Sequence, residues 1–234
     1  MVLTGAGISA ESGIPTFRGA DGLWEGHRVE DVATPEGFDR DPDTVQRFYD
    51  QRRRALAHVA PNAAHLALAR LEASPHHEVL VVTQNVDDLH ERAGSRQIVH
   101  MHGELRRALC RCCGARPEWD ADLLDAPPCP VCGARCLRPD VVWFGEVPYE
   151  LDRIEAAVAE CDVFAAVGTS GEVYPAAGFA ALAAALGART VELNLAPTGA
   201  VAASGLPVFD EAAAGPATVV VPAWVDALFA AARD

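Results

Sequence analysis

Four cysteines in two closely spaced pairs constrain this chain more than any other feature. Cys110 and Cys113 form one pair and Cys129 and Cys132 the other, with two residues inside each pair and fifteen between the pairs. This spacing is typical of two zinc knuckles, and four thiolates make a closed tetrahedral site for one structural Zn²⁺ ion. Structural zinc contributes roughly 10 kcal/mol or more to folding. We therefore expect residues 106–138 to form a small zinc-binding module without a catalytic role.

The remaining cysteines lie close to this set or in apolar surroundings. Cys112 and Cys136 could compete as zinc ligands, whereas Cys161 is expected in the core. No secretory segment opens the chain, which predicts a cytoplasmic protein whose clustered cysteines are reduced ligands rather than disulfides. No apolar run approaches the roughly 18 residues of a membrane span, so we expect no membrane partner.

Outside the cysteine-rich segment, short apolar runs alternate with helical patterns. This alternation predicts an α/β fold with a doubly wound, parallel, Rossmann-like sheet. Predicted strands lie at 2–4, 79–83, 163–167, 190–194 and 218–221, and a helix is predicted at 222–233. We expect a single catalytic domain over 1–234. Its Rossmann-like part comprises 1–27, 72–105 and 139–234, with a helical module at 28–71 and the zinc-binding module at 106–138.

The charge of the chain limits its partners. Its 234 residues carry 19 basic and 33 acidic side chains, a net charge of −14 at pH 7. Such a protein repels phosphate backbones, so we expect no nucleic-acid partner. Cationic partners such as lysine-rich peptides would be steered toward it. Half of the residues are hydrophobic, and we expect a globular monomer.

A glycine-rich turn follows the first predicted strand. Gly5, Gly7 and Ala10 match the Gly/Ala version of the dinucleotide fingerprint, in which glycines let the backbone approach a pyrophosphate. A tight turn without a ligand is the alternative. An ordinary dehydrogenase would have a second strand ending in an acid about 20 residues later. Residues 14–26 are loop-like instead, which predicts a different segment over the cofactor.

Three further groups of residues are candidates for chemistry. Gln84, Asn85 and Asp87 follow a strand, where a doubly wound sheet binds ligands, although a polar helix cap is equally compatible. His102 suits proton transfer near neutral pH, but His100 lies on the same face of an extended segment, and spacing alone does not choose between them.

Tyr49 and Arg52 lie one helical turn apart and could face one pocket. An arginine in an apolar cleft binds a carboxylate through two hydrogen bonds. The alternative is an exposed basic helix face, because Arg53 and Arg54 follow directly. The pattern alone favours that exposed face.

Taken together, these segments resemble the sirtuin family of NAD-dependent protein-lysine deacylases. The resemblance covers essentially the whole chain, in family order: Gly5–Ser9, Thr16–Arg18, Gln84–Asp87, His100–Glu104, the four cysteines, Val142–Glu146, Gly168–Ser170 and Glu192–Asn194. It is closest to the bacterial members of the class III, desuccinylase-type branch, through Gly22–Trp24, Ala33–Glu36, the Tyr49/Arg52 pair and Val173–Gly178.

The resemblance assigns roles that the residues alone leave open. It implies that His102 is the general base and that Gln84, Asn85 and Asp87 hold the nicotinamide and its ribose. It implies NAD as co-substrate, bound also by Gly5, Ala6, Gly7, Ser9, Glu11, Thr16, Phe17, Arg18, Trp24, Gly168, Thr169, Ser170, Asn194, Leu195 and Ala217.

For the acyl-lysine, the resemblance implies that Tyr49 and Arg52 bind the acyl carboxylate and that Ala33 keeps the pocket roomy. The peptide is implied to pair as a strand between two segments, at Val142, Phe144, Gly145, Glu146, Val173 and Tyr174. The implied reaction removes succinyl and malonyl groups, and also acetyl, from protein lysines, giving nicotinamide, O-acyl-ADP-ribose and free lysine. Protein mono-ADP-ribosyl transfer at the same NAD site is the alternative.

Overall fold

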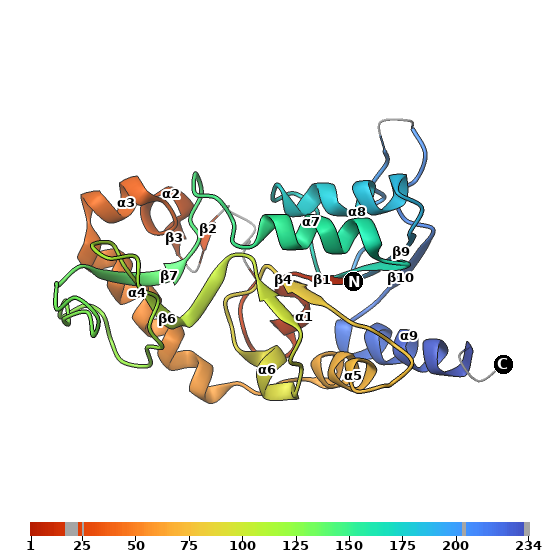
Figure 1. Cartoon of the computed structure of the whole chain (residues 1–234), viewed down its shortest axis with the longest axis horizontal. Helices are drawn as coiled ribbons and strands as arrows, with labels where there is room; N and C mark the ends of the chain where they lie inside the picture. Colours follow the sequence, from red (N-terminus) through yellow and green to blue (C-terminus); the bar gives the residue numbers. More distant parts are fainter. Residues whose placement is uncertain (17–22, 25, 203–204, 232–234) are drawn as a thin grey trace.

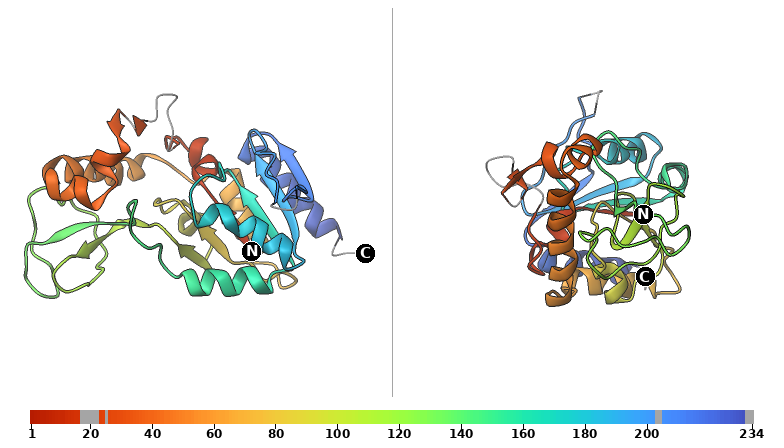
Figure 2. Two further views of the ribbon diagram at one scale, coloured as in Figure 1. Left: turned by 90° about the horizontal axis from the view of Figure 1, so that it is seen from above. Right: turned by 90° about the vertical axis from the view of Figure 1, so that its left-hand side faces the viewer.

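A computed structural model describes residues 1–16, 23–24, 26–202 and 205–231. The predicted NAD residues Phe17 and Arg18 lie outside the described residues. Figures 1 and 2 show an elongated molecule with two parts, which we call the sheet lobe and the small lobe. The sheet lobe is built on the six-stranded sheet, and the small lobe comprises residues 26–58 and 103–143.

The sheet lobe contains a parallel sheet with the strand order β10-β9-β8-β1-β4-β5. The strands are β1 (Val2–Thr4), β4 (Val81–Thr83), β5 (Ile98–His100), β8 (Val163–Val167), β9 (Arg189–Asn194) and β10 (Glu211–Ala214). Strands β4 and β5 are added on one side of β1, and β8, β9 and β10 on the other, so the strand order reverses at β1. The doubly wound parallel sheet predicted from the alternating pattern is confirmed.

Alternate strand residues point to opposite faces, and each face is covered by helices. Val2 and Val81 share a core with α5 (Ala63–Glu72), α9 (Ala217–Ala231) and Ile8 of α1 (Ala6–Ala10). Leu3 and Val82 share a second core with α7 (Leu151–Glu160) and α8 (Ala176–Ala185). Helix α5, which the predicted helical module included, therefore packs on the sheet. The short α6 (Leu89–Ala93) lies beside α5.

Helix α9 corrects one prediction. The β-branched run at residues 218–221 was expected to be a strand, but it belongs to this helix. Ala217, Val221 and Val225 are buried at a spacing of four residues and pack on the sheet, and Pro216 accepts hydrogen bonds from the first turn. Burial of this helical stripe outweighs the modest strand preference of valine. The last strand is the alanine-rich β10 instead.

The small lobe combines helices with a two-stranded sheet. Its elements are β3 (His27–Arg28), α2 (Val29–Val32), α3 (Pro35–Arg40), α4 (Pro42–Ala55), the 3₁₀ turn η1 (Leu56–His58), β6 (Gly103–Cys110) and β7 (Leu137–Val141). Strand β2 (Leu23–Trp24) pairs with β3. The helices and the β6–β7 sheet share an apolar core that includes Phe48, Leu105 and Trp143.

The members of a buried ion pair within α4 hydrogen-bond to the cysteine-rich segment. Arg53 and Asp50 lie 2.6 Å apart, and each side chain is only 2% exposed. Asp50 also accepts hydrogen bonds from the backbone N–H groups of Leu123 and Leu124. Arg53 donates to the carbonyl of Leu105. Arg53 is therefore part of the interior, and α4 does not present a uniform basic face to solvent.

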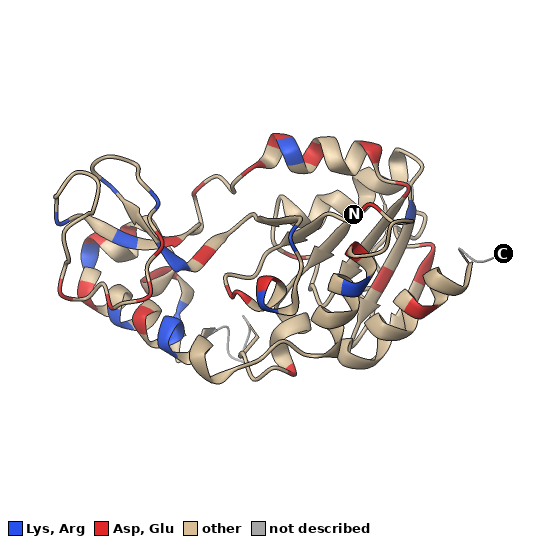
Figure 3. Ribbon diagram, turned by 60° about the horizontal axis from the view of Figure 1, so that its bottom comes forward, with Lys and Arg blue, Asp and Glu red and all other residues tan. Residues whose placement is uncertain are grey.

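Charge is distributed unevenly between the lobes. Figure 3 shows most of the basic residues on the small lobe, whereas acidic residues are spread over both. No helix in the described ranges combines the length and the apolar character needed to cross a bilayer.

Candidate active site

A cavity of about 710 Å³ lies where the carboxyl ends of β1, β4, β8 and β9 meet the small lobe. Such a strand-end crevice is the usual ligand site of a doubly wound sheet. The described residues to which the family resemblance assigns NAD binding or catalysis all line it: Gly5, Ala6, Gly7, Ser9, Glu11, Thr16, Trp24, Gln84, Asn85, Asp87, His102, Gly168, Thr169, Ser170, Asn194, Leu195 and Ala217. So do the candidate substrate residues Ala33, Tyr49, Arg52, Val142, Phe144, Gly145, Glu146, Val173 and Tyr174.

The glycines of the first turn allow two strand-end loops to touch. A Cβ atom on Gly7 would lie 2.7 Å from the Cα of Gly168, and one on Gly5 would lie 2.8 Å from the carbonyl oxygen of Gly168. Gly168 itself has a positive φ of 58°, and the N–H of Gly7 donates to its carbonyl. These glycines are therefore required by backbone packing between the β1 and β8 loops, in addition to any approach of a pyrophosphate.

Beneath the cavity floor, polar side chains form a buried network. The amide of Asn85 donates to Ser9 Oγ and to the carbonyl of Gly5, both at 3.1 Å. Ser9 Oγ donates to Asp87 at 2.9 Å, and His65 lies 3.4 Å from the same hydroxyl. Burial raises the pKa of Asp87, although hydrogen bonds from Leu89 and Ser9 oppose the shift. The network fixes the orientation of the Asn85 and Asp87 side chains.

A second set of contacts orders the end of the cavity near β8 and β9. Gln84 donates to Thr169 Oγ1 at 3.1 Å, and Asn194 donates to the carbonyl of Thr169 at 2.8 Å. Glu11 accepts hydrogen bonds from the backbone and hydroxyl of Thr218 at the start of α9. The first two bonds join the carboxyl ends of β4, β8 and β9, and those of Glu11 join the end of α1 to the start of α9.

The structure distinguishes the two candidate histidines. His102 lines the cavity, and its Nδ1 lies 3.1 Å from the carbonyl oxygen of Gln84. A carbonyl can only accept, so Nδ1 carries the proton and Nε2 is left with a lone pair. Burial lowers the pKa of His102 despite that hydrogen bond. His100 pairs with Glu91 instead and is outside the cavity lining.

Tyr49 and Arg52 lie together at the small-lobe end of the cavity. The Tyr49 side chain is fully buried, and Arg52 is 9% exposed. The Arg52 guanidinium stacks on the Phe48 ring at 3.2 Å from its centroid and donates to the Phe48 carbonyl. The ring of Trp24 also lies 5.0 Å from this guanidinium. The alternative of an exposed basic face is therefore wrong for Arg52.

Two of the side chains that line the cavity are exposed large hydrophobic groups. Phe144 is 45% exposed and Tyr174 is 79% exposed. The N–H of Phe144 donates to the carbonyl of Ala33, which anchors Phe144 to the small lobe. Exposed apolar groups at a cavity are suited to contact with a partner chain.

The four paired cysteines converge in the small lobe. Their sulfur atoms all lie within 4.8 Å of one another, and a tetrahedral zinc site with bonds of about 2.3 Å separates its sulfurs by about 3.8 Å. In each knuckle a glycine with positive φ, Gly114 or Gly133, follows the second cysteine and donates its N–H to the carbonyl of the first. The donor set and its turns fit a structural zinc ion.

The other two cysteines of the module differ from expectation. Cys112 and Cys136 were expected to be reduced and in competition for zinc, but the structure joins them in a disulfide. They lie 24 positions apart in the chain. The pairing of β6 with β7 brings together the loop that follows β6 and the loop that precedes β7. Cys161 is partly buried against the core of the sheet lobe, as expected.

Known proteins share most of this sequence. The model of the Sir2 family matches residues 5–175. The chain belongs to the Sir2 family. An NAD-dependent protein deacylase of Pasteurella multocida (strain Pm70) is 54% identical over 96% of this chain and 95% of that protein. The NAD-dependent protein deacylase of Escherichia coli (strain K12) is 55% identical over 97% of this chain and 81% of that protein.

Solved structures of the Sir2 family share this architecture. A Sir2 homolog–NAD complex has a TM-score of 0.87 and 41% identity, covering 99% of this chain and 89% of that one. Sir2Af2 bound to a myristoylated histone peptide has a TM-score of 0.73 and 34% identity, covering 96% of this chain and 88% of that one. The Sir2 fold thus extends over nearly the whole chain, and the strand-end cavity is part of it.

Sequence reasoning missed several residues of this Sir2 cavity. Ala55, Leu56 and Val59 line it, and the first two continue the face of α4 that carries Tyr49 and Arg52, at the helical period. That period was the available signal. Trp143 also lines the cavity, although only the residues on either side of it were assigned to the substrate.

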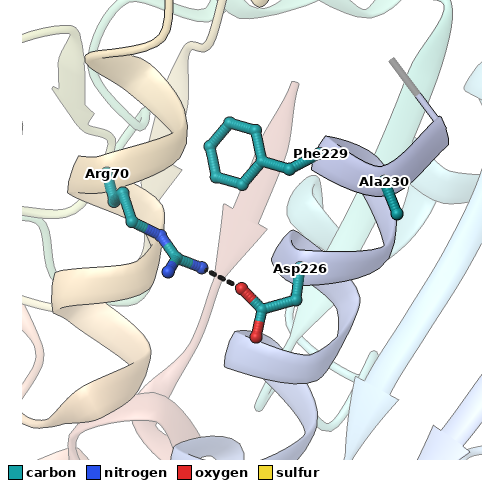
Figure 4. A pocket seen from close by; sticks show the side chains of 4 residues that line it. All are labelled: Arg70, Asp226, Phe229 and Ala230. Carbon is teal, nitrogen blue, oxygen red and sulfur yellow. Dashed lines mark hydrogen bonds and ion pairs between the residues drawn. The ribbon is translucent and has the colours of Figure 1, made fainter. Parts of the chain in front are cut away.

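A second hollow lies away from the Sir2 cavity, between α5 and α9. Figure 4 shows Arg70 and Asp226 joined across it, with Phe229 and Ala230 beside them. Both charged side chains are more than half exposed. An exposed ion pair of this kind contributes little to binding or stability, so we assign the chemistry to the strand-end cavity alone.

Proposed function

We propose that this Sir2-family chain is an NAD-dependent protein-lysine deacylase that prefers acidic acyl groups, succinyl and malonyl, and also removes acetyl. One observation supports the acyl preference above all others. The buried guanidinium of Arg52 and the buried phenol of Tyr49 line the same cavity as His102 and the glycine turn. A permanent positive charge at the end of an acyl-sized pocket selects for a carboxylate.

The strand-end loops would hold NAD. The Gly5–Gly7 turn and Gly168–Ser170 would bind its phosphates, and Asn194 and Leu195 its adenosine end. Gln84, Asn85 and Asp87 would hold the nicotinamide and its ribose. The buried bonds from Asn85 through Ser9 to Asp87 support this proposal, because they fix these side chains before the nucleotide arrives.

His102 would act as the general base. In the reaction, the acyl oxygen attacks the ribose carbon that releases nicotinamide. His102 Nε2 would then accept a proton from a ribose hydroxyl, whose oxygen captures the acyl carbon. Addition of water to that carbon and cleavage of its bond to the lysine nitrogen would release free lysine and O-acyl-ADP-ribose. The Gln84 carbonyl holds Nδ1–H, so the lone pair needed to accept the proton is on the other nitrogen. The lowered pKa keeps the imidazole neutral at physiological pH.

The acyl-lysine protein would bind beside the exposed side chains of Phe144 and Tyr174. It would pair as a strand between residues 144–146 and 172–174. Ala33 is a small buried side chain that lines the same cavity and leaves room for a chain longer than acetyl. A hydrogen bond to a charged group is worth about 1.5–3 kcal/mol, which corresponds to about a 10- to 100-fold preference for the acidic acyl group.

One structural Zn²⁺ would be held by Cys110, Cys113, Cys129 and Cys132. The convergence of the four sulfurs supports this proposal. Four protein ligands fill a tetrahedral site, so the ion would fold the small lobe and take no part in the reaction.

A paired assay tests the proposed function. The purified protein receives NAD with one of two peptides that differ only in the acyl group, acetyl-lysine or succinyl-lysine, and nicotinamide release and peptide mass are followed. We expect both peptides to lose their acyl group only when NAD is present, and the succinyl peptide to react faster. Turnover of the acetyl peptide alone would contradict the acyl preference, and turnover of neither would contradict the deacylase.

A further inference from the structure

The hydroxyl of Tyr49 makes a single hydrogen bond within the described part of the chain. Trp143 Nε1 lies 2.9 Å from the phenol oxygen. An indole N–H can only donate, so the phenol oxygen is the acceptor in this bond. The proton of the phenol is therefore directed away from Trp143. Both side chains are buried, and both line the cavity.

Trp143 is itself held rigidly from two sides. The guanidinium of Arg138 lies 4.0 Å from the centroid of its ring. Arg138 also pairs with Glu146 at 2.7 Å, and the same carboxylate accepts the backbone N–H of Trp143 at 2.9 Å. The indole N–H thus has a fixed direction, set by a cation on its ring and a carboxylate on its backbone.

The same contacts control charge at this end of the cavity. Glu146 lines the cavity. Its ion pair with Arg138 offsets the negative charge of its carboxylate. Burial raises the pKa of Tyr49, so the phenol stays protonated at neutral pH. The Tyr49 phenol and the Arg52 guanidinium line the same cavity as Glu146.

We propose that Trp143 is a positioning residue for acyl specificity: its indole N–H occupies the acceptor side of the Tyr49 hydroxyl and so makes that hydroxyl a donor to the acyl carboxylate. This inference rests on the proposed preference for acidic acyl groups. It adds that the preference depends on a residue that does not touch the carboxylate. A hydroxyl fixed as donor matches an anion, which only accepts, better than it matches a neutral acyl end.

A double-mutant cycle tests this proposal. Trp143→Phe keeps an aromatic ring and removes the N–H, and Tyr49→Phe removes the hydroxyl on which it acts. The wild type, both single variants and the double variant are assayed with the succinyl and acetyl peptides. The readout is the ratio of succinyl to acetyl kcat/KM, with KM and kcat reported separately. Trp224→Phe is the matched control, because Trp224 Nε1 on α9 has no partner among the described residues.

We expect Trp143→Phe to lower the ratio by about 2- to 10-fold, the value of one neutral hydrogen bond, mainly through a higher KM for the succinyl peptide. The double variant is expected to match Tyr49→Phe alone, because the indole acts through the phenol. Trp224→Phe should keep the wild-type ratio.

Several results would overturn the proposal. An unchanged ratio in Trp143→Phe, or losses that add in the double variant, would show that the indole does not act through Tyr49. If Trp143→Phe unfolds, benzothienylalanine at position 143 replaces the N–H by sulfur in a ring of the same shape, and the same fall in ratio is expected. A wild type without preference for succinyl would instead contradict the proposed acyl specificity itself, and this inference with it.

Discussion

At the scale of single residues, Arg52 shows how context decides the role of a charge. The triplet Arg52–Arg54 reads as a solvated face, yet its members have three different environments. Arg52 lines the cavity, Arg53 is in a buried ion pair, and Arg54 is 59% exposed. Helical geometry separates them by about 100° each. Residue type alone therefore could not predict which arginine faces the cavity.

Replacing Arg52 tests its proposed role. In Arg52→Met the apolar stem is kept and the charge is lost. We expect succinyl kcat/KM to fall by about 10- to 100-fold, while acetyl kcat/KM falls far less, because acetyl has no carboxylate. Kinetics with the two matched peptides measure this difference. Arg54→Met is the control on the same helix, and an equal loss on both peptides would remove Arg52 from the acyl site.

The pH dependence of turnover tests His102. Its pKa is lowered by burial, so protonation of the base is expected only below the ordinary histidine value of about 6.5. We therefore expect kcat/KM to stay level as the pH falls through neutrality and to drop on an acid limb below about pH 6.5.

His100 supplies the contrast for this measurement. Burial lowers its pKa, but the hydrogen bond and charge of Glu91 raise it further, for a net increase. An acid limb above about pH 6.5 that disappears in His100→Gln would assign the titration to His100 and contradict the role of His102.

At the scale of elements, the sequence predicts motifs that follow directly from a strand or a turn. It does not predict how separate elements pack against one another. The strand-end placement of Gly5–Gly7, Gln84–Asp87 and Gly168–Ser170 follows from the parallel sheet. The run at 218–221 became the start of α9 because its buried stripe packs on the sheet. The disulfide between Cys112 and Cys136 depends on the approach of two loops, which the sequence does not encode locally.

We call the Asp50–Arg53 ion pair and its hydrogen bonds to the cysteine-rich segment the clasp. It is expected to contribute strongly to the free energy of unfolding. Asp50→Asn leaves the Arg53 guanidinium buried without its counter-charge, and breaking a buried pair on one side costs about 3–5 kcal/mol. Urea unfolding should show this loss in the free energy of unfolding. Asp43→Asn, at an exposed position on the first turn of the same helix, should change it by less than about 0.5 kcal/mol. Equal, small effects in both variants would mean that the clasp is not important for stability.

At the scale of the whole molecule, two buried histidines link folding to pH. Burial lowers the pKa of His65 to about 4 and that of His90 to about 3. The unfolded chain binds these protons near pH 6.5, so it takes up more protons than the folded one between about pH 6.5 and 4. Stability is therefore expected to fall as the pH is lowered through this range.

Urea midpoints at several pH values between about 7 and 5 measure this effect. His90→Gln removes one of the titrating groups and should flatten the slope. The His100–Glu91 pair acts in the opposite sense, because the raised pKa of His100 favours the folded state below about pH 6.5. Equal slopes of midpoint against pH in the wild type and in His90→Gln would contradict a neutral, buried His90.

The composition of the whole chain excludes the protein itself as an acyl-lysine substrate. None of the 234 residues is a lysine, so all 19 side chains counted as basic are arginine. The protein therefore contributes no side-chain acyl-lysine to a reaction, and every acyl-lysine consumed belongs to the added substrate.

The most direct test is to follow the acyl group itself. The protein is incubated with NAD and a succinyl-lysine peptide, and mass spectrometry is applied to the small molecules, the peptide and the protein. We expect equal amounts of nicotinamide, free-lysine peptide and ADP-ribose that carries the succinyl group. Intact peptide together with ADP-ribose attached to a protein side chain would contradict the deacylase and indicate ADP-ribosyl transfer at the same NAD site.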